Sequence, residues 1–69
     1  MNRKLYAIFN LINGMRTYGL DLFQKSTPGS SEQIAGQTIF RFCSFLIGYI
    51  IDNQNLLSKT FFPDEHESF

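Results

Sequence analysis

One long apolar stretch constrains this chain more than any other feature of its sequence. From Ile34 to Ile51 the residues read IAGQTIFRFCSFLIGYII, and the charge of Arg41 is the only one among them. Wound as an α-helix, this stretch is apolar over roughly two-thirds of its circumference, whereas a helix on a soluble surface needs an apolar stripe of about 100°. We therefore predict a helix that is covered on most sides, either by lipid as a single membrane span or by protein.

The short length of the chain limits what can cover such a helix. The chain has 69 residues and one cysteine, Cys43, so no internal disulfide forms, and no Cys/His spacing indicates a zinc site. A domain of this size buries only about 60% of its unfolded surface and is marginal without a staple, a metal or a partner. We therefore expect the stability to come from lipid or from other subunits.

Charge is distributed unevenly between the two halves of the chain. Residues 1–41 carry five bases and two acids, a net charge of +3, and residues 42–69 carry one base and four acids, a net charge of −3. A basic flank before an apolar stretch is typical of a single span with its N-terminus on the cytoplasmic or matrix side. The basic residues are scattered rather than clustered, which does not favour nucleic acid as a partner.

The expected fold is all-α. Apolar residues at helical spacing predict an amphipathic, interfacial helix over 1–25, and Pro28 and Gly29 predict a turn over 26–30. Ser30 and Gln33 fit a capping box at the start of a long helix over 31–57, with a predicted span at about 34–51, followed by an acidic tail over 58–69. The first helix fits equally well as the amphipathic half of a helical hairpin.

A polar seam on the second helix contains the candidate functional residues. On a helical wheel its residues share one arc, and we expect this seam to pack against neighbouring subunits while lipid covers the rest. A central Arg costs a lone span roughly 2.5–3.5 kcal/mol, which also favours a partner. Arg41 is expected to pair with an acidic side chain of a neighbour or to contact an anionic headgroup such as that of cardiolipin. The seam comprises Gly36, Gln37, Arg41, Ser44 and Gly48.

No motif in the sequence predicts catalysis. We expect no catalytic, cofactor-binding or metal site, no cofactor and no small-molecule substrate. His66 lies in the acidic tail, where a solvated side chain is the better interpretation than a metal ligand, and its role stays open. Cys43 lies on the apolar side of its helix, which predicts a buried, unreactive thiol.

In general character the chain resembles the small single-span accessory subunits of mitochondrial respiratory-chain and ATP synthase complexes. The basic amphipathic N-terminal part, the apolar stretch and the acidic tail carry this likeness, which covers the chain loosely and transfers no residue roles. It implies a non-catalytic subunit that contributes to assembly and stability in the inner membrane. The N-terminus would then lie in the matrix and the C-terminus in the intermembrane space.

Two other classes of protein fit the same sequence. One is a soluble helical-hairpin binding module that completes a core with a larger partner. The other is a small membrane-active peptide, which the net charge of zero disfavours because such peptides are usually cationic on their polar face.

Overall fold

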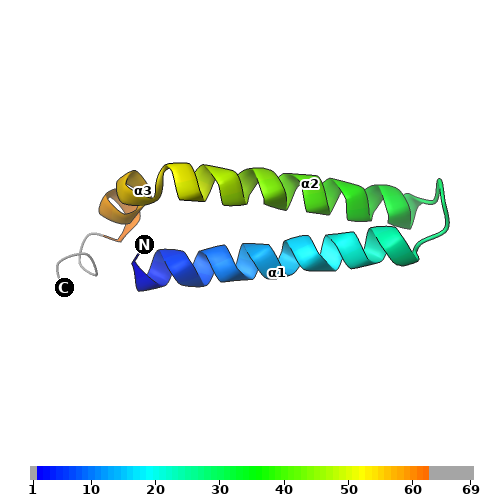
Figure 1. The fold of residues 1–69 in the computed structure, drawn as a ribbon, viewed down its shortest axis with the longest axis horizontal. Coiled ribbons are helices and arrows are strands. Elements are labelled where there is room, and N and C mark those ends of the chain that lie inside the picture. The colour runs from blue at the N-terminus through cyan, green and yellow to red at the C-terminus, as the bar shows by residue number, and fades with distance from the viewer. Residues whose placement is uncertain (1, 63–69) are drawn as a thin grey trace.

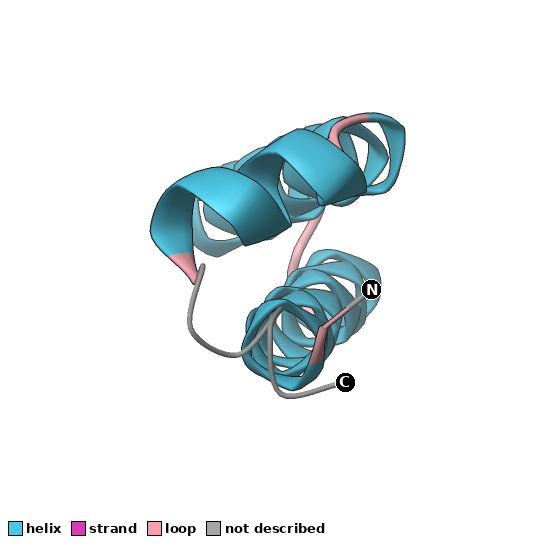
Figure 2. Ribbon diagram, turned by 90° about the vertical axis from the view of Figure 1, so that its left-hand side faces the viewer, coloured by secondary structure: helices cyan, strands magenta, loops and turns pink. Residues whose placement is uncertain are grey.

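The protein folds into three helices in a computed structural model that describes residues 2–62. They are α1 (Arg3–Lys25), α2 (Ser31–Asp52) and α3 (Gln54–Phe61). α1 and α2 run antiparallel, side by side, and form a helical hairpin, while α3 lies across the open end of the hairpin (Figures 1 and 2). The predicted all-α fold is confirmed, and the hairpin arrangement of the first two helices is now established.

Polar side chains define where the first two helices begin. The Asn2 Oδ1 accepts a hydrogen bond from the Leu5 N–H at 2.8 Å, and the Ser30 Oγ accepts one from the Gln33 N–H at 3.2 Å. Gln33 in turn accepts the Gly29 N–H at 2.7 Å, one residue earlier than a capping box requires. Gly29 has a φ of +82°, a left-handed conformation that favours glycine and lets the chain reverse between α1 and α2.

The second helix ends earlier than the sequence pattern suggested. α2 stops at Asp52, and α3 continues to Phe61, where we expected one helix to about residue 57 and an irregular tail. The break lies at Asn53, whose φ of −118° and ψ of 21° are not helical and whose side-chain Nδ2 donates to the Tyr49 carbonyl at 2.9 Å. Asparagine ends helices readily because its side chain competes for backbone hydrogen bonds. Residues 63–69 of the predicted tail lie outside the described residues.

Residues spaced by seven form the contact between α1 and α2, and we call them the inner row. Leu5 and Gly19 are buried on α1, and Gly36, Cys43 and Ile50 are buried on α2. A seven-residue repeat keeps one seam of each helix facing its neighbour, as in left-handed coiled coils. The half-buried Ile12 on α1 and Ser26, directly after α1, complete the row.

Two glycines bring the helices into backbone contact near the turn. A Cβ atom added to Gly19 would lie 2.9 Å from the Gly36 carbonyl oxygen, and one added to Gly36 would lie 2.7 Å from the Gly19 carbonyl oxygen. The second Cβ would also lie 2.6 Å from the backbone nitrogen of Phe23. No side chain fits at either position without separating the helices, so both glycines are required by this close approach.

Candidate functional site: an open apolar face

The hairpin buries few of its apolar side chains. Among residues 2–62 the buried hydrophobic residues are Leu5, Cys43 and Ile50, and none of their side chains is fully buried. Many larger ones stay in contact with solvent, such as Leu11 at 66% exposure and Phe42 at 60%. Single exposed apolar side chains are normal on a soluble protein, but a contiguous group of them marks an interaction site.

Eight apolar residues gather along one side of the inner row, and we call them the open face. On each helix they recur every three or four residues, so they form one stripe per helix, and the two stripes are adjacent in the antiparallel hairpin. None of the eight carries a charge. The open face consists of Ile8, Leu11, Met15 and Tyr18 on α1, and Ile39, Phe42, Leu46 and Tyr49 on α2.

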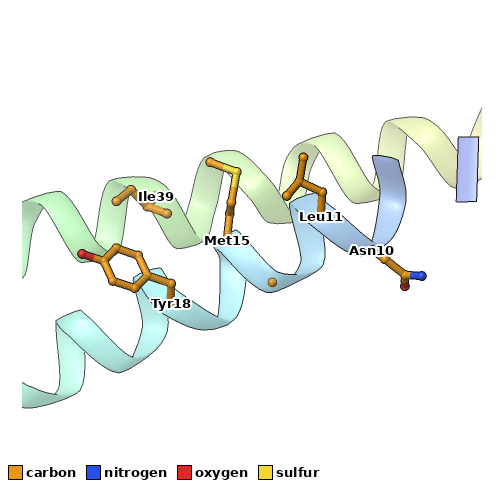
Figure 3. A pocket seen from close by; sticks show the side chains of 6 residues that line it. Asn10, Leu11, Met15, Tyr18 and Ile39 are labelled. Atoms are coloured by element: carbon orange, nitrogen blue, oxygen red, sulfur yellow. The ribbon is translucent and has the colours of Figure 1, made fainter. Parts of the chain in front are cut away.

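A shallow, mostly apolar groove runs along the α1 side of the open face. Figure 3 shows Leu11, Met15 and Tyr18 of α1 beside Ile39 of α2, which together line this groove. Gly14 lies at its edge, and a Cβ added there would find no atom within 4 Å. The groove therefore has room for a side chain from another molecule to insert between those of the two helices.

The opposite side of the inner row carries a polar contact that joins the two helices. The Arg16 Nε donates a hydrogen bond to the Ser44 Oγ at 2.8 Å, and the guanidinium carbon lies 4.7 Å from the centre of the Phe40 ring. Both contacts are partly buried, so they orient α1 against α2 on this side. The two sides of the hairpin thus differ: on one side a polar contact joins the helices, and on the open face the described residues form no hydrogen bond between the helices.

The sequence pattern did not single out Arg16, which counted only as one of the basic residues of the N-terminal half. A signal existed, because Arg16 lies seven residues after Phe9 and seven before Phe23, in a row of otherwise apolar residues next to the inner row. A charged residue in such a row indicates a polar partner on the neighbouring helix. The register of the hairpin, which the sequence does not show, identifies that partner as Ser44.

The predicted polar seam is divided in the structure. Gly36 faces α1 at the backbone contact, and Ser44 accepts the hydrogen bond of Arg16. Gln37 and Gly48 are exposed, and a Cβ added to Gly48 would find open space. Two members of the seam therefore pack within the chain, and the packing of the others against a neighbouring subunit stays a prediction.

Arg41 is the third outward-facing member of that seam. It is exposed and lies at the edge of a second shallow pocket, which it lines with Phe23 and Phe40 among others. Within residues 2–62 its guanidinium makes neither an ion pair nor a hydrogen bond. Arg41 is thus available for an acidic or anionic partner, and the predicted contact with such a partner stays untested.

Groups that carry chemistry in other proteins are sparse in the described part of the chain. Cys43 is a free, buried cysteine in the inner row. Within residues 2–62 no three His, Cys, Asp or Glu side chains come together as a metal site would require. His66 lies outside the described residues. Packing surfaces, rather than reactive groups, are what this region offers.

α2 itself is long and apolar enough to cross a membrane, judged by its length and composition. A core helix of a soluble protein meets the same criterion, but it is then mostly buried, whereas only 17% of the apolar window of α2 is buried in the hairpin. Among the described residues α1 therefore covers α2 only in part.

Comparison of this chain with protein families, with curated proteins and with solved structures finds no match.

Proposed function

We propose that this chain is a non-catalytic helical-hairpin binding module that completes a hydrophobic core with a protein partner. The single observation that carries this proposal is the open face, an uncharged stripe of eight apolar residues that extends over both helices of the hairpin. Exposed apolar patches of this kind mark surfaces for protein or membrane contact. Because both helices contribute to the face, its use requires the hairpin to stay closed.

The closed hairpin argues for protein rather than lipid as the cover. α1 packs along α2 over most of its length, so a bilayer around α2 would also have to accept α1. α1 carries Arg16 near the centre of its sequence and Asp21 one turn before its end, and it exposes Asn10 and Asn13. On insertion scales an Arg or Asp near the centre of a span costs roughly 2.5–3.5 kcal/mol, so α1 is a poor transmembrane helix. A protein partner covers the open face and leaves the polar back of α1 in water.

A second function has its own supporting observation. α2 alone meets the length and composition of a span while exposing most of its surface, which supports a single-span accessory subunit of a membrane complex such as those of the mitochondrial inner membrane. In that case α1 separates from α2 and lies on the membrane surface, and Arg41 contacts a neighbouring subunit or an anionic headgroup.

Carbonate extraction of membranes from cells that express the full chain distinguishes the two functions. A binding module is released into the supernatant, whereas an integral span stays in the pellet. Retention in the pellet would reject the binding module in favour of the accessory subunit. Arg41→Leu adds a second readout, because removing the charge increases retention of a spanning helix. It leaves a soluble hairpin in the supernatant, because Arg41 is exposed and makes no ion pair or hydrogen bond in the described residues.

The use of the open face in binding is tested separately with a matched pair of variants. Leu11→Asp places a carboxylate on the open face, and Asn13→Asp places one two residues away on the exposed back of α1. A partner that covers the open face is lost from chemical cross-links with Leu11→Asp and kept with Asn13→Asp. Equal cross-linking of both variants would show that the open face is not the binding surface.

A further inference from the structure

We infer that the molecule covering the open face is a second copy of this chain, and that two hairpins form a four-helix bundle with both turns at the same end. This inference rests on the proposed function and names its partner. Each hairpin leaves one uncharged apolar face without a cover. Two copies can cover these faces against each other, because the faces have the same length and the same residues.

The side of the hairpin that carries the open face, including its charged ends, is large enough for a specific dimer. α2 has 22 residues and is therefore about 33 Å long, and a pair of helices is about 20 Å across. The whole side of the hairpin that carries the open face therefore covers about 650 Å² in each copy, or about 1,300 Å² for the pair, and the eight residues of the open face form its apolar middle. Specific protein interfaces bury about 1,200–2,000 Å² in total, so one hairpin packed face to face on another falls within this range.

Charges at the ends of the open face determine how the second copy is oriented. On α1, Lys4 lies seven residues before Leu11 and Lys25 lies seven after Tyr18, so the stripe ends in a base on both sides. On α2, Glu32 lies seven residues before Ile39, and Asp52 lies one turn beyond Tyr49, so this stripe ends in an acid on both sides. All four charged residues, Lys4, Lys25, Glu32 and Asp52, are exposed.

Only one of the two symmetric arrangements pairs these charges favourably. If the turns lie at the same end, α1 of each copy faces α2 of the other, and bases meet acids at both ends of the bundle. If the turns lie at opposite ends, α1 faces α1, and Lys4 approaches Lys25 of the second copy. Charges at the rim of an interface add little affinity, but like charges brought together exclude an arrangement, so they select the orientation.

Lys25 already pairs with Asp21 within α1, at 3.2 Å between Nζ and Oδ2. Both side chains of this pair are mostly exposed, and such surface pairs between residues four apart contribute little stability. The existing pair therefore does not prevent Lys25 from facing Glu32 of a second copy.

The mass of the purified full chain in solution tests the dimer. Light scattering after size exclusion is expected to give twice the chain mass of 8.0 kDa. Leu11→Asp is expected to raise the dimer Kd by roughly two orders of magnitude, because the dimer would bury an unpaired carboxylate. Asn13→Asp is expected to leave the Kd unchanged. Circular dichroism of each variant shows whether the hairpin itself stays helical.

Cysteine cross-linking tests the orientation and does not depend on a variant of the open face. Thr27→Cys in the turn and Asn55→Cys at the open end are each made together with Cys43→Ala. With both turns at one end, Thr27→Cys cross-links to itself through a short bismaleimide, and a mixture of the two variants forms no mixed product. Mixed products without self cross-links would instead place the turns at opposite ends, about 33 Å apart, and would overturn the proposed orientation.

The remaining outcomes separate this inference from the proposed function. A helical monomer at high micromolar concentration that still cross-links a different protein through the open face overturns the dimer and leaves the binding module standing. A chain retained in the carbonate pellet overturns both. A dimer that persists in Leu11→Asp shows that the open face is not the interface.

Discussion

The inner row and the open face of this hairpin both consist largely of apolar residues, but the inner row is buried between the helices and the open face is mostly exposed. At the inner row, Gly19 and Gly36 let the helix backbones touch, and Leu5, Cys43 and Ile50 are buried. On the open face the side chains recur every three or four residues, and six of the eight are exposed. Apolar periodicity alone therefore does not decide what a helix buries, because the closest contact forms where side chains are smallest.

This difference separates two kinds of stability. The inner row holds the hairpin together within one chain, and its contribution is independent of protein concentration. The open face contributes only when another molecule covers it, so its contribution rises with the concentration of that molecule. Substitutions in the inner row should therefore lower stability at every protein concentration, whereas those on the open face should lower it only at high concentration. The largest losses of stability should come from the inner row.

Gly36→Ala is expected to have the largest effect. The new Cβ would approach the backbone of Gly19 and Phe23 to within 2.7 Å, so the helices must separate. Overpacking of this kind costs about 1–3 kcal/mol, more than the alanine gains in helix propensity. Urea unfolding followed by circular dichroism measures the loss, and unchanged stability would mean that the helices do not meet at this point.

Arg16→Met is expected to lower the free energy of unfolding by about 1 kcal/mol. The substitution keeps an unbranched stem but removes the hydrogen bond to Ser44 and the contact with the Phe40 ring. A double-mutant cycle with Ser44→Ala isolates the hydrogen bond. Strictly additive losses in that cycle would show that Arg16 and Ser44 do not interact.

Gly48→Ala is the matched control for the inner row and is expected to stabilise the protein. Gly48 lies in α2 like Gly36, but a Cβ added there finds no atom within 4 Å. Alanine then gains about 0.5–1 kcal/mol from its higher helix propensity. A loss of stability measured by the same urea experiment would reveal a contact at this position that the isolated hairpin does not make.

Phe42→Ser is expected to have the smallest effect on the dilute chain. Its ring is 60% exposed in the hairpin, and substitutions at exposed sites usually change stability by less than about 0.5 kcal/mol. At high concentration the same variant should lose the increase in melting temperature that association gives the unmodified chain. Melting curves recorded over a hundredfold range of protein concentration test both statements. Over such a range the stabilisation that binding provides changes by about 2.7 kcal/mol.

Much of the fold follows from local patterns in the sequence. Pro28 and Gly29 place the turn, and Ser30 and Gln33 place the start of the second helix, because each acts on the backbone within a few residues. The end of α2 at Asn53 depends on a balance between helix propensity and a single side-chain hydrogen bond, which local patterns do not resolve.

The face that α2 turns towards α1 was harder to predict. Gly36, Ser44 and Gly48 share one arc on a helical wheel, yet only Gly36 and Ser44 contact α1. The register of the hairpin decides this, and the register depends on where Gly19 meets Gly36, a contact between residues far apart in the sequence. The sequence shows that α1 is amphipathic, but it does not show which residues of α2 each residue of α1 contacts.

Burial of the only thiol in the chain gives the hairpin a built-in reporter of its own opening. Cys43 is 3% exposed between the two helices, so a thiol reagent reaches it only when α1 and α2 part. The rate of labelling under native conditions therefore measures how often the hairpin opens, with no need to introduce a cysteine. The same measurement in the presence of lipid vesicles would record whether a membrane draws the two helices apart.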